Sequence, residues 1–135
     1  MTGARAGVVA AAGWALSEPV LGAILRTPYS DVRLLGRVVT RRRGWRAAGL
    51  AVHLANGAVF GAAFARLGLR GTRQGVAAAQ VENLLVWPGM LVLDRIHPDR
   101  RIGAWPPLFT DRRVAGYEVV AHALFGALLG RLVSD

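Results

Sequence analysis

The sequence predicts an all-α integral membrane protein, a bundle of four transmembrane helices, on the strength of three observations. The 135-residue chain is 53% hydrophobic with a mean hydropathy of +0.36, more apolar than a soluble domain of this length usually is. Four of its stretches approach the length of about 20 apolar residues that a helix needs to cross a hydrocarbon core. Arginines collect between these stretches, as is typical of loops beside a membrane. We therefore expect a single transmembrane domain over residues 1–135.

The predicted helices cover residues 6–25, 47–69, 75–93 and 114–133, and each is bounded by arginine, proline or aspartate. The first could instead be a cleaved secretory signal, because Arg5 precedes its apolar run. That run is longer than the apolar region of a usual signal, and no convincing small-residue cleavage site closes it. We therefore interpret it as a helix of the mature protein.

The distribution of arginine predicts the orientation in the membrane. The basic loops 26–46 and 94–113 hold seven and five of the 17 arginines, and the rest of the chain holds five. Cytoplasmic loops retain the excess of positive charge, so both termini are predicted outside a bacterial inner membrane. The net charge of +9 could also suit nucleic acid, but no soluble core is present to carry such a site. We expect anionic lipid headgroups as partners and no nucleic acid.

The first basic loop is predicted to contain a short amphipathic helix. Ser30 and Asp31 can cap its start, and arginines then fall on one stripe with leucines and valines on another. Such a helix is expected to lie in the membrane interface, the alternative being an ordinary solvated loop. The arginines expected to contact lipid headgroups are Arg33, Arg37, Arg41, Arg42 and Arg43.

Small residues recur at every fourth position of the second and fourth predicted helices. In lipid, such ridges let helix backbones approach closely, either inside one bundle or between two copies, so we expect a homo-oligomer. The glycines expected to serve helix packing are Gly49, Gly57, Gly61, Gly126 and Gly130. Pro19 and Pro88 lie inside apolar runs and are predicted to kink their helices.

An internal repeat is predicted by sliding the sequence on itself. A shift of 69 residues places His53, Gly57 and Gly61 on His122, Gly126 and Gly130, and a shift of 68 aligns the glycines of the first and third helices. We interpret the pattern as two helix pairs related by an axis along the membrane normal, with chance similarity in Gly/Ala-rich sequence as the alternative.

Polar residues inside the predicted helices are the candidate functional residues, since ionisable groups are costly within a bilayer. They are Glu18, His53, Asn56, Glu82, Asn83, Glu118 and His122. Glu18 and His53 lie at similar depths from the basic side and could pair. Glu118 and His122, four residues apart, share one helical face.

Three functions fit these residues. The hypothesis favoured by the sequence is a non-enzymatic membrane scaffold or partner subunit that self-associates through its glycine ridges, because four helices are few for a solute pathway. The second is a proton or ion conductor that uses the intramembrane glutamates and histidines. The third is a haem-binding bundle, since His53 and His122 could supply two axial ligands at equivalent depth.

Enzyme and metal motifs are missing from the sequence. No cysteine is present, and no Walker loop, G-x-S-x-G or H-E-x-x-H motif occurs, so we expect no catalytic residues and no enzymatic activity. His97, Pro98 and Asp99 form a polar cluster that we interpret as a turn, because no further metal ligands lie nearby.

Several short motifs are spread along most of the chain. They are Gly7-Val8-Val9, Glu18-Pro19, His53 with Asn56, Gln74-Gly75, Trp87-Pro88, and Glu118 with His122. Together they resemble the YagU-like family of small bacterial inner-membrane proteins. The resemblance implies a polytopic membrane bundle with a role in envelope or pH-related physiology, and it transfers no catalytic residues. Glu82 is not part of this pattern.

Overall fold

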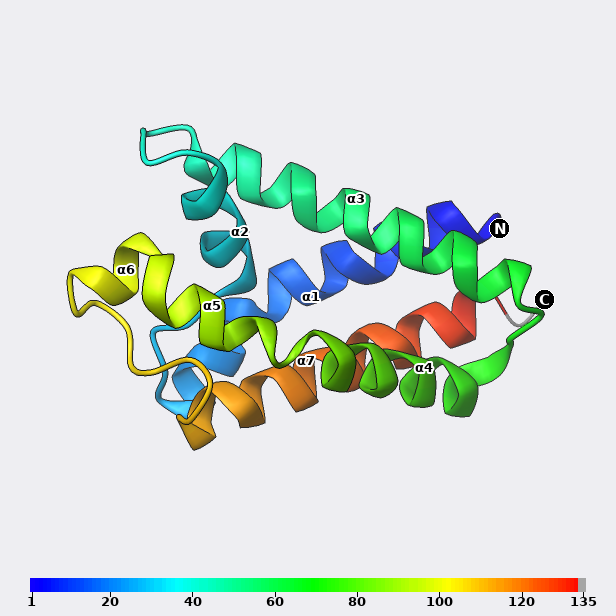
Figure 1. The fold of residues 1–135 in the computed structure, drawn as a ribbon. Coiled ribbons are helices and arrows are strands. Elements are labelled where there is room, and N and C mark those ends of the chain that lie inside the picture. Colours follow the sequence, from blue (N-terminus) through cyan, green and yellow to red (C-terminus); the bar gives the residue numbers. More distant parts are fainter. Residues whose placement is uncertain (134–135) are drawn as a thin grey trace.

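The computed structural model describes residues 1–133, all of whose regular structure is helical (Figure 1). The helices are α1 (Gly3–Leu25), α2 (Asp31–Val39), α3 (Trp45–Arg66), α4 (Gly71–Val86), α5 (Gly89–Ile96), α6 (Pro98–Arg101) and α7 (Arg112–Leu132). The predicted all-α fold class is confirmed. The predicted domain runs to Asp135, and its last two residues lie outside the described range.

Membrane-spanning character is strongest in the first half of the chain. Helices α1 and α3 are each long and apolar enough to cross a membrane, and α4 and α5 meet that test together as one span bent by 52°. The described residues therefore contain two candidate spans, or three if α4 and α5 together are taken as one further span. The predicted fourth span corresponds to α7, which carries Glu118 and His122 and is not among these candidates.

The third predicted helix is interrupted where the sequence places Pro88. Helix α4 ends at Val86, and α5 starts only at Gly89. Proline has no backbone N–H to donate, and its ring clashes with the preceding turn, so the chain changes direction there. The predicted distortion at Pro88 is thus confirmed as a break, whereas α1 continues through Pro19 to Leu25 as a single helix.

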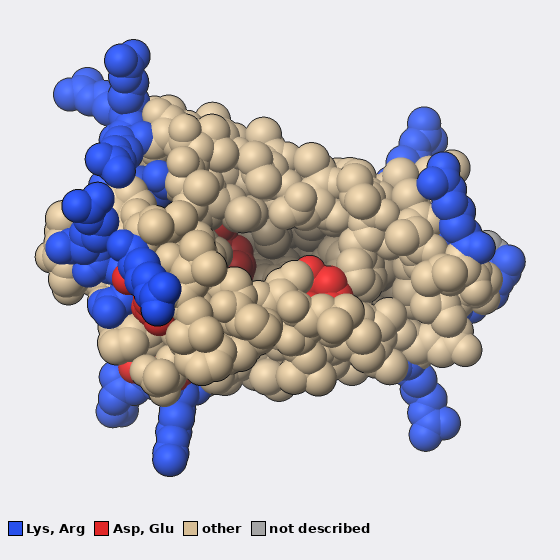
Figure 2. Space-filling view, viewed as in Figure 1, with Lys and Arg blue, Asp and Glu red and all other residues tan. Residues whose placement is uncertain are grey.

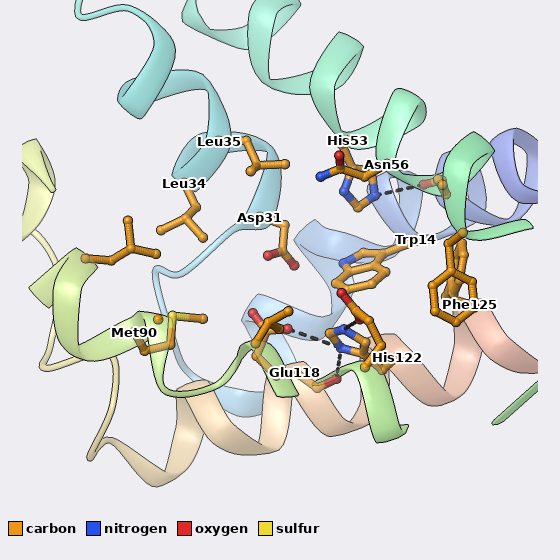
Figure 3. A pocket seen from close by; sticks show the side chains of 17 residues that line it. Trp14, Asp31, Leu34, Leu35, His53, Asn56, Met90, Glu118, His122 and Phe125 are labelled. Atoms are coloured by element: carbon orange, nitrogen blue, oxygen red, sulfur yellow. Dashed lines mark hydrogen bonds and ion pairs between the residues drawn. The ribbon is translucent and has the colours of Figure 1, made fainter. Parts of the chain in front are cut away.

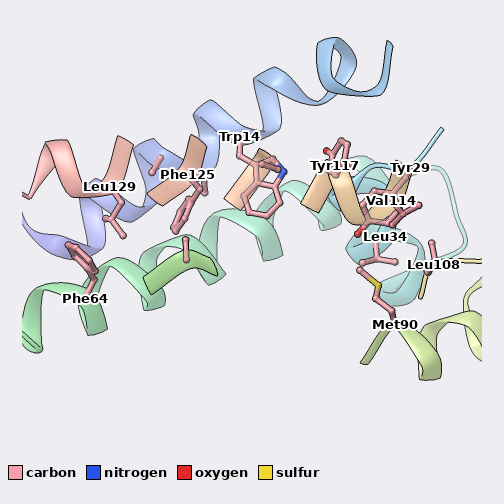
Figure 4. Packing of buried hydrophobic residues seen from close by; sticks show 14 of the residues in the cluster. Trp14, Tyr29, Leu34, Phe64, Met90, Leu108, Val114, Tyr117, Phe125 and Leu129 are labelled. Carbon is pink, nitrogen blue, oxygen red and sulfur yellow. The ribbon is translucent and has the colours of Figure 1, made fainter. Parts of the chain in front are cut away.

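Four long helices lie lengthwise in the order α3, α1, α7, α4, with α1 packed against α3 and α7, and α7 packed against α4 (Figure 1). The chain enters and leaves at the same end of this row, and α2, α5 and α6 lie at the opposite end (Figure 1). Large buried residues line the inner side, from Phe64 and Leu129 near the termini to Leu108 and Met90 at the far end (Figure 4). The outer faces are strongly apolar and exposed, for example Leu16 at 81% and Leu85 at 76%, as a lipid-facing surface requires.

Glycine contacts close both lengthwise helix pairs. A Cβ on Gly7 of α1 would overlap the carbonyl oxygen of Gly57 on α3, and a Cβ on Gly75 of α4 would overlap that of Gly126 on α7. The predicted packing residues Gly49, Gly57, Gly61, Gly126 and Gly130 all meet the backbone of a neighbouring helix within the protomer. These ridges are therefore occupied inside the bundle, and the expected homo-oligomer would need a different surface.

The short amphipathic helix predicted in the first basic loop is α2. The Ser30 side chain accepts a hydrogen bond from the backbone N–H of Arg33, as predicted for its cap. Gly36 of α2 packs against the start of α3, beside Trp45 and Gly49. A Cβ on Gly36 would overlap the carbonyl oxygen of Trp45 and lie 3.2 Å from the Gly49 Cα. Helix α2 is thereby fixed across one end of the bundle.

Candidate functional site: an acidic cleft

A cavity of about 280 Å³ opens on the flank of the bundle between α3 and the α4–α5 bend. We call it the acidic cleft, because acidic side chains are visible inside the hollow in a face that otherwise shows no charge between its two arginine-rich ends (Figure 2). Its polar and aromatic lining residues are Trp14, Asp31, His53, Asn56, Phe60, Glu82, Glu118, His122 and Phe125. Leucine, valine and methionine side chains complete the wall.

His122 lies between two carboxylates on the floor of the cleft (Figure 3). Its Nε2 is 2.9 Å from Glu82 Oε2 on α4, and its Nδ1 is 3.2 Å from Glu118 Oε2 on its own helix. Nδ1 also lies 2.7 Å from the Glu118 carbonyl oxygen, to which it donates. The proton between Nε2 and Glu82 can therefore reside on either group. The predicted contact of Glu118 with His122 is confirmed.

Tyr29 extends this chain toward α2. Its hydroxyl is 2.9 Å from Asp31 Oδ1 and also contacts Glu118 Oε1. A hydroxyl has one proton to donate, so the two carboxyls share the Tyr29 hydroxyl as their donor. Burial, and then the charges of Glu118 and Glu18, raise the pKa of the Asp31 carboxyl well above its ordinary value. Asp31 therefore takes up a proton more readily than an ordinary aspartate does.

Glu18 has a different role from the one the sequence suggested. Its carboxylate accepts hydrogen bonds from the Ser30 hydroxyl and, at 3.1 Å, from the backbone N–H of Val32. It thus satisfies the N-terminus of α2. His53 instead places Nε2 3.2 Å from the carbonyl oxygen of Ala11. The predicted pairing of Glu18 with His53 is wrong, because each side chain has a backbone partner on another helix.

Trp14 lies between the two histidines that could have held a haem (Figure 3). Its ring centroid is 5.0 Å from that of His53 and 4.6 Å from that of His122. An indole occupies the space that a porphyrin would need, and the nitrogens of His122 are committed to glutamates. The residues present therefore do not fit a bis-histidine haem. Across residues 1–133, no three His, Cys, Asp or Glu side chains are grouped as a metal ion would require.

The two predicted asparagines lie apart. Asn56 lines the cleft from α3, whereas Asn83 is buried and donates to Gln80 Oε1 at 3.4 Å. Gln80 in turn donates to the Val119 carbonyl oxygen at 2.8 Å, which ties α4 to α7. Of the two, only Asn56 is placed to contact a molecule in the cleft.

Sequence reasoning missed a buried ionic cluster at the basic end. Asp99 is fully buried, and its two oxygens accept from Arg33 Nε and Nη2, each at 2.9 Å, with Arg37 Nη2 at 3.8 Å. His97 stacks on Trp105 with a centroid distance of 4.7 Å and an interplanar angle of 6°. The cluster joins α2 to α6. Arg33 and Arg37, predicted to contact headgroups, thus turn toward Asp99, whereas Arg41, Arg42 and Arg43 are exposed.

His97 caps α6 and is not merely part of a turn. Its Nδ1 accepts the backbone N–H of Asp99 at 3.2 Å, so its Nε2 carries the proton and donates to the Leu34 carbonyl oxygen, also at 3.2 Å. Burial lowers the pKa of the His97 imidazole below its ordinary value; the hydrogen bond to the Leu34 carbonyl and the charge of Asp99 oppose this shift, and the charges of Arg37 and Arg33 add to it.

Acidification is expected to destabilise the protein through His97. Below about pH 6.5, His97 binds a proton in the unfolded chain but stays neutral in the folded protein. The free energy of unfolding therefore decreases as the pH falls toward the pKa of the folded state. Thermal unfolding in detergent, followed by circular dichroism between about pH 7.5 and pH 5, measures this loss. His97→Gln should remove the contribution and leave a shallower dependence. An equal slope in wild type and variant would contradict the assignment.

In comparisons with known proteins, no family model, no curated protein and no solved structure matches the chain.

Proposed function

We propose that the protein conducts protons or other cations within the membrane, and that the acidic cleft is its binding site. One observation supports this above the rest: His122 is held between Glu82 and Glu118 at 2.9 and 3.2 Å. Through Tyr29 the same chain reaches Asp31, so exchangeable protons are linked from the middle of the bundle to its basic end. Such a chain of titratable groups is what proton movement requires.

The scaffold hypothesis accounts less well for the cleft. A purely structural network is expected to satisfy its buried polar atoms. Within residues 1–133, however, Asp31 Oδ2 is buried without a hydrogen-bond partner, and Asp31 lines the cleft. An unsatisfied carboxylate oxygen beside an open cavity favours a site that exchanges protons or ligands. The proposal includes no enzymatic activity.

The membrane topology that we propose has four spans, with α7 as the fourth. Helix α7 buries Glu118 and His122 against other helices, so its polar face is shielded from lipid by protein. The proposed membrane is a bacterial inner membrane, with both termini outside and with Arg41, Arg42 and Arg43 beside anionic headgroups. We further propose that the protein is a member of the YagU-like family, on the basis of the motifs that resemble that family.

We also propose that the two helix pairs are an internal repeat that has diverged at the cleft. The shifts of 68 and 69 residues that align the glycine contacts also align Trp14 with Glu82 and His53 with His122. In one half an indole packs against the histidine, and in the other a carboxylate bonds to it. One half would then supply an aromatic wall and the other a proton-exchanging wall.

Proton flux in reconstituted vesicles tests the proposed function. With a potassium gradient and valinomycin as the driving force, wild-type protein should acidify vesicles that contain a pH-sensitive dye. Glu82→Gln should lower the rate by at least about tenfold, because loss of a proton-transfer group costs on that order or more. Glu82 is only partly buried, so this variant is expected to fold.

Asp111→Asn is the matched control for this experiment. Asp111 lies outside the cleft and caps α7, and asparagine caps a helix about as well, so its flux should equal that of wild type. Wild-type vesicles as tight as protein-free vesicles would overturn the proposed function.

A further inference from the structure

We propose that the acidic cleft binds a lipophilic organic ammonium ion, a protonated amine carried on an aromatic or branched apolar body. This inference rests on the proposed function and names the class of cation that the site takes. Four features of the cleft support it: its charge, its unpartnered carboxylate oxygen, its walls and its mouth.

The charge of the cleft favours a cation. Asp31, Glu82 and Glu118 line it, no arginine does, and His53 and His122 are the two bases in its wall. Buried carboxylates must be protonated or paired, because an isolated buried anion is very costly. A protonated amine would supply at Asp31 the positive charge that a bound proton otherwise supplies.

One unpartnered atom faces the position where such a ligand would lie. Asp31 is 9% exposed and Trp14, beside it in the wall, is 7% exposed, and within the described residues Asp31 Oδ2 lacks a hydrogen-bond partner. Figure 3 shows both side chains bordering the same space, with the indole directed toward the Asp31 side. Oδ2 can accept an ammonium N–H, which a metal ion or a quaternary ammonium does not offer.

The walls favour an apolar body over a bare or hydrated ion. Phe60, Phe125, Leu34, Met90 and Leu93 line the cleft beside the carboxylates. With a volume of about 280 Å³, the cavity is near the lower end of ligand pockets, which suits one aromatic ring with a short aminoalkyl chain. A small hydrated cation would leave this apolar surface without a partner.

The position of the mouth indicates the route of entry. In Figure 2 the hollow opens on the flank of the molecule, midway between the two ends where arginines gather. This flank is the apolar surface expected to face lipid. A ligand with an apolar body partitions into lipid, so it can approach such a mouth laterally.

Binding of 2-phenylethylammonium to the purified full-length protein in detergent tests the inference, with 2-phenylethanol as a neutral ligand of similar size. We expect saturable quenching of tryptophan fluorescence by the ammonium ion, and binding at least about tenfold weaker for the alcohol, since each 1.4 kcal/mol of charge-assisted bonding is worth that factor. Trp14→Phe should remove the quenching, which assigns the signal to the cleft.

Asp31→Asn should weaken ammonium binding by at least about tenfold and leave the alcohol unchanged, because asparagine cannot become the carboxylate that pairs with the ammonium ion. If that variant fails to fold, Glu82→Gln carries the same test, and Asp111→Asn is the control that should bind as wild type does. Equal affinity for the ammonium and the alcohol, or no saturable binding, would overturn the inference. Proton flux that persists without ammonium binding would leave the proposed function standing, so the two failures are distinguishable.

Discussion

Gly126→Val is expected to prevent the bundle from folding, the largest effect of any single substitution predicted for this protein. A Cβ at Gly126 would overlap the carbonyl oxygen of Gly75 and lie 2.8 Å from the Val76 Cα. These are backbone atoms of α4, which cannot rotate away as a side chain can. Overpacking costs about 1–3 kcal/mol where side chains adjust, and more where they cannot, against a total stability of about 5–15 kcal/mol for a typical domain.

Titration with sodium dodecyl sulfate in mixed micelles, followed by circular dichroism and tryptophan fluorescence, measures this loss. Gly126→Ala should retain the fold with a lowered midpoint, and Gly57→Val should behave as Gly126→Val does, because a Cβ at Gly57 lies 2.6 Å from the Gly7 carbonyl oxygen. Gly44→Ala is the control, since no atom lies within 4 Å of a Cβ placed there. An unchanged midpoint for Gly126→Val would contradict the close contact of α4 with α7.

The lengthwise helices and their glycine contacts could be predicted from sequence because both depend on local patterns. An apolar run long enough to span lipid predicts the two ends of a helix to within a few residues. Glycine at every fourth position then marks one face of that helix. The break at Pro88 has an equally local cause. Whether α7 spans the membrane depends less on local sequence, because it depends on which helices cover the polar face of α7.

The acidic cleft could be predicted only in part. Glu118 and His122 are four residues apart on one helix, so their contact follows from helical geometry. Glu82 reaches the same histidine from 40 residues away, and Tyr29 reaches Glu118 from 89 residues away. Those contacts depend on how α2, α4 and α7 cross, which no periodicity in the sequence specifies. The place of Trp14 between the two histidines, which removes the haem hypothesis, depends on how α1 packs between α3 and α7.

The basic end shows why charge counting alone misses a site. Seventeen basic residues look equivalent when loops are compared for topology, yet Arg33 and Arg37 meet a buried aspartate and the arginines at 41–43 do not. The sequence feature that could have indicated this ionic cluster is Asp99 itself. It is an acidic residue within an arginine-rich loop, and the charge count used for membrane topology does not account for it. A buried carboxylate needs a partner, and arginine offers the bidentate geometry for one.

Arg33→Gln is expected to destabilise the folded protein by about 2–3 kcal/mol, near the lower limit for breaking a buried ion pair. The substitution leaves Asp99 fully buried with only Arg37, at 3.8 Å, to balance it. The cost is reduced because the Arg33 side chain is partly exposed, so that solvent already screens its attraction to Asp99 in the wild-type protein. Arg43→Gln, on the exposed part of the same basic loop, should change the unfolding midpoint little.

A double-mutant cycle separates the pair from the loss of arginine as such. Because Asp99→Asn removes the buried charge that Arg33 compensates, the combined variant Arg33→Gln/Asp99→Asn should be more stable than the sum of the single effects predicts, by at least about 1 kcal/mol. Strictly additive effects, measured by the same detergent titration, would show that the two groups do not interact. Since this pair joins α2 to α6 at the end of the bundle where Leu34 and Met90 line the cleft, its loss should also weaken ammonium binding without removing any carboxylate from the cleft.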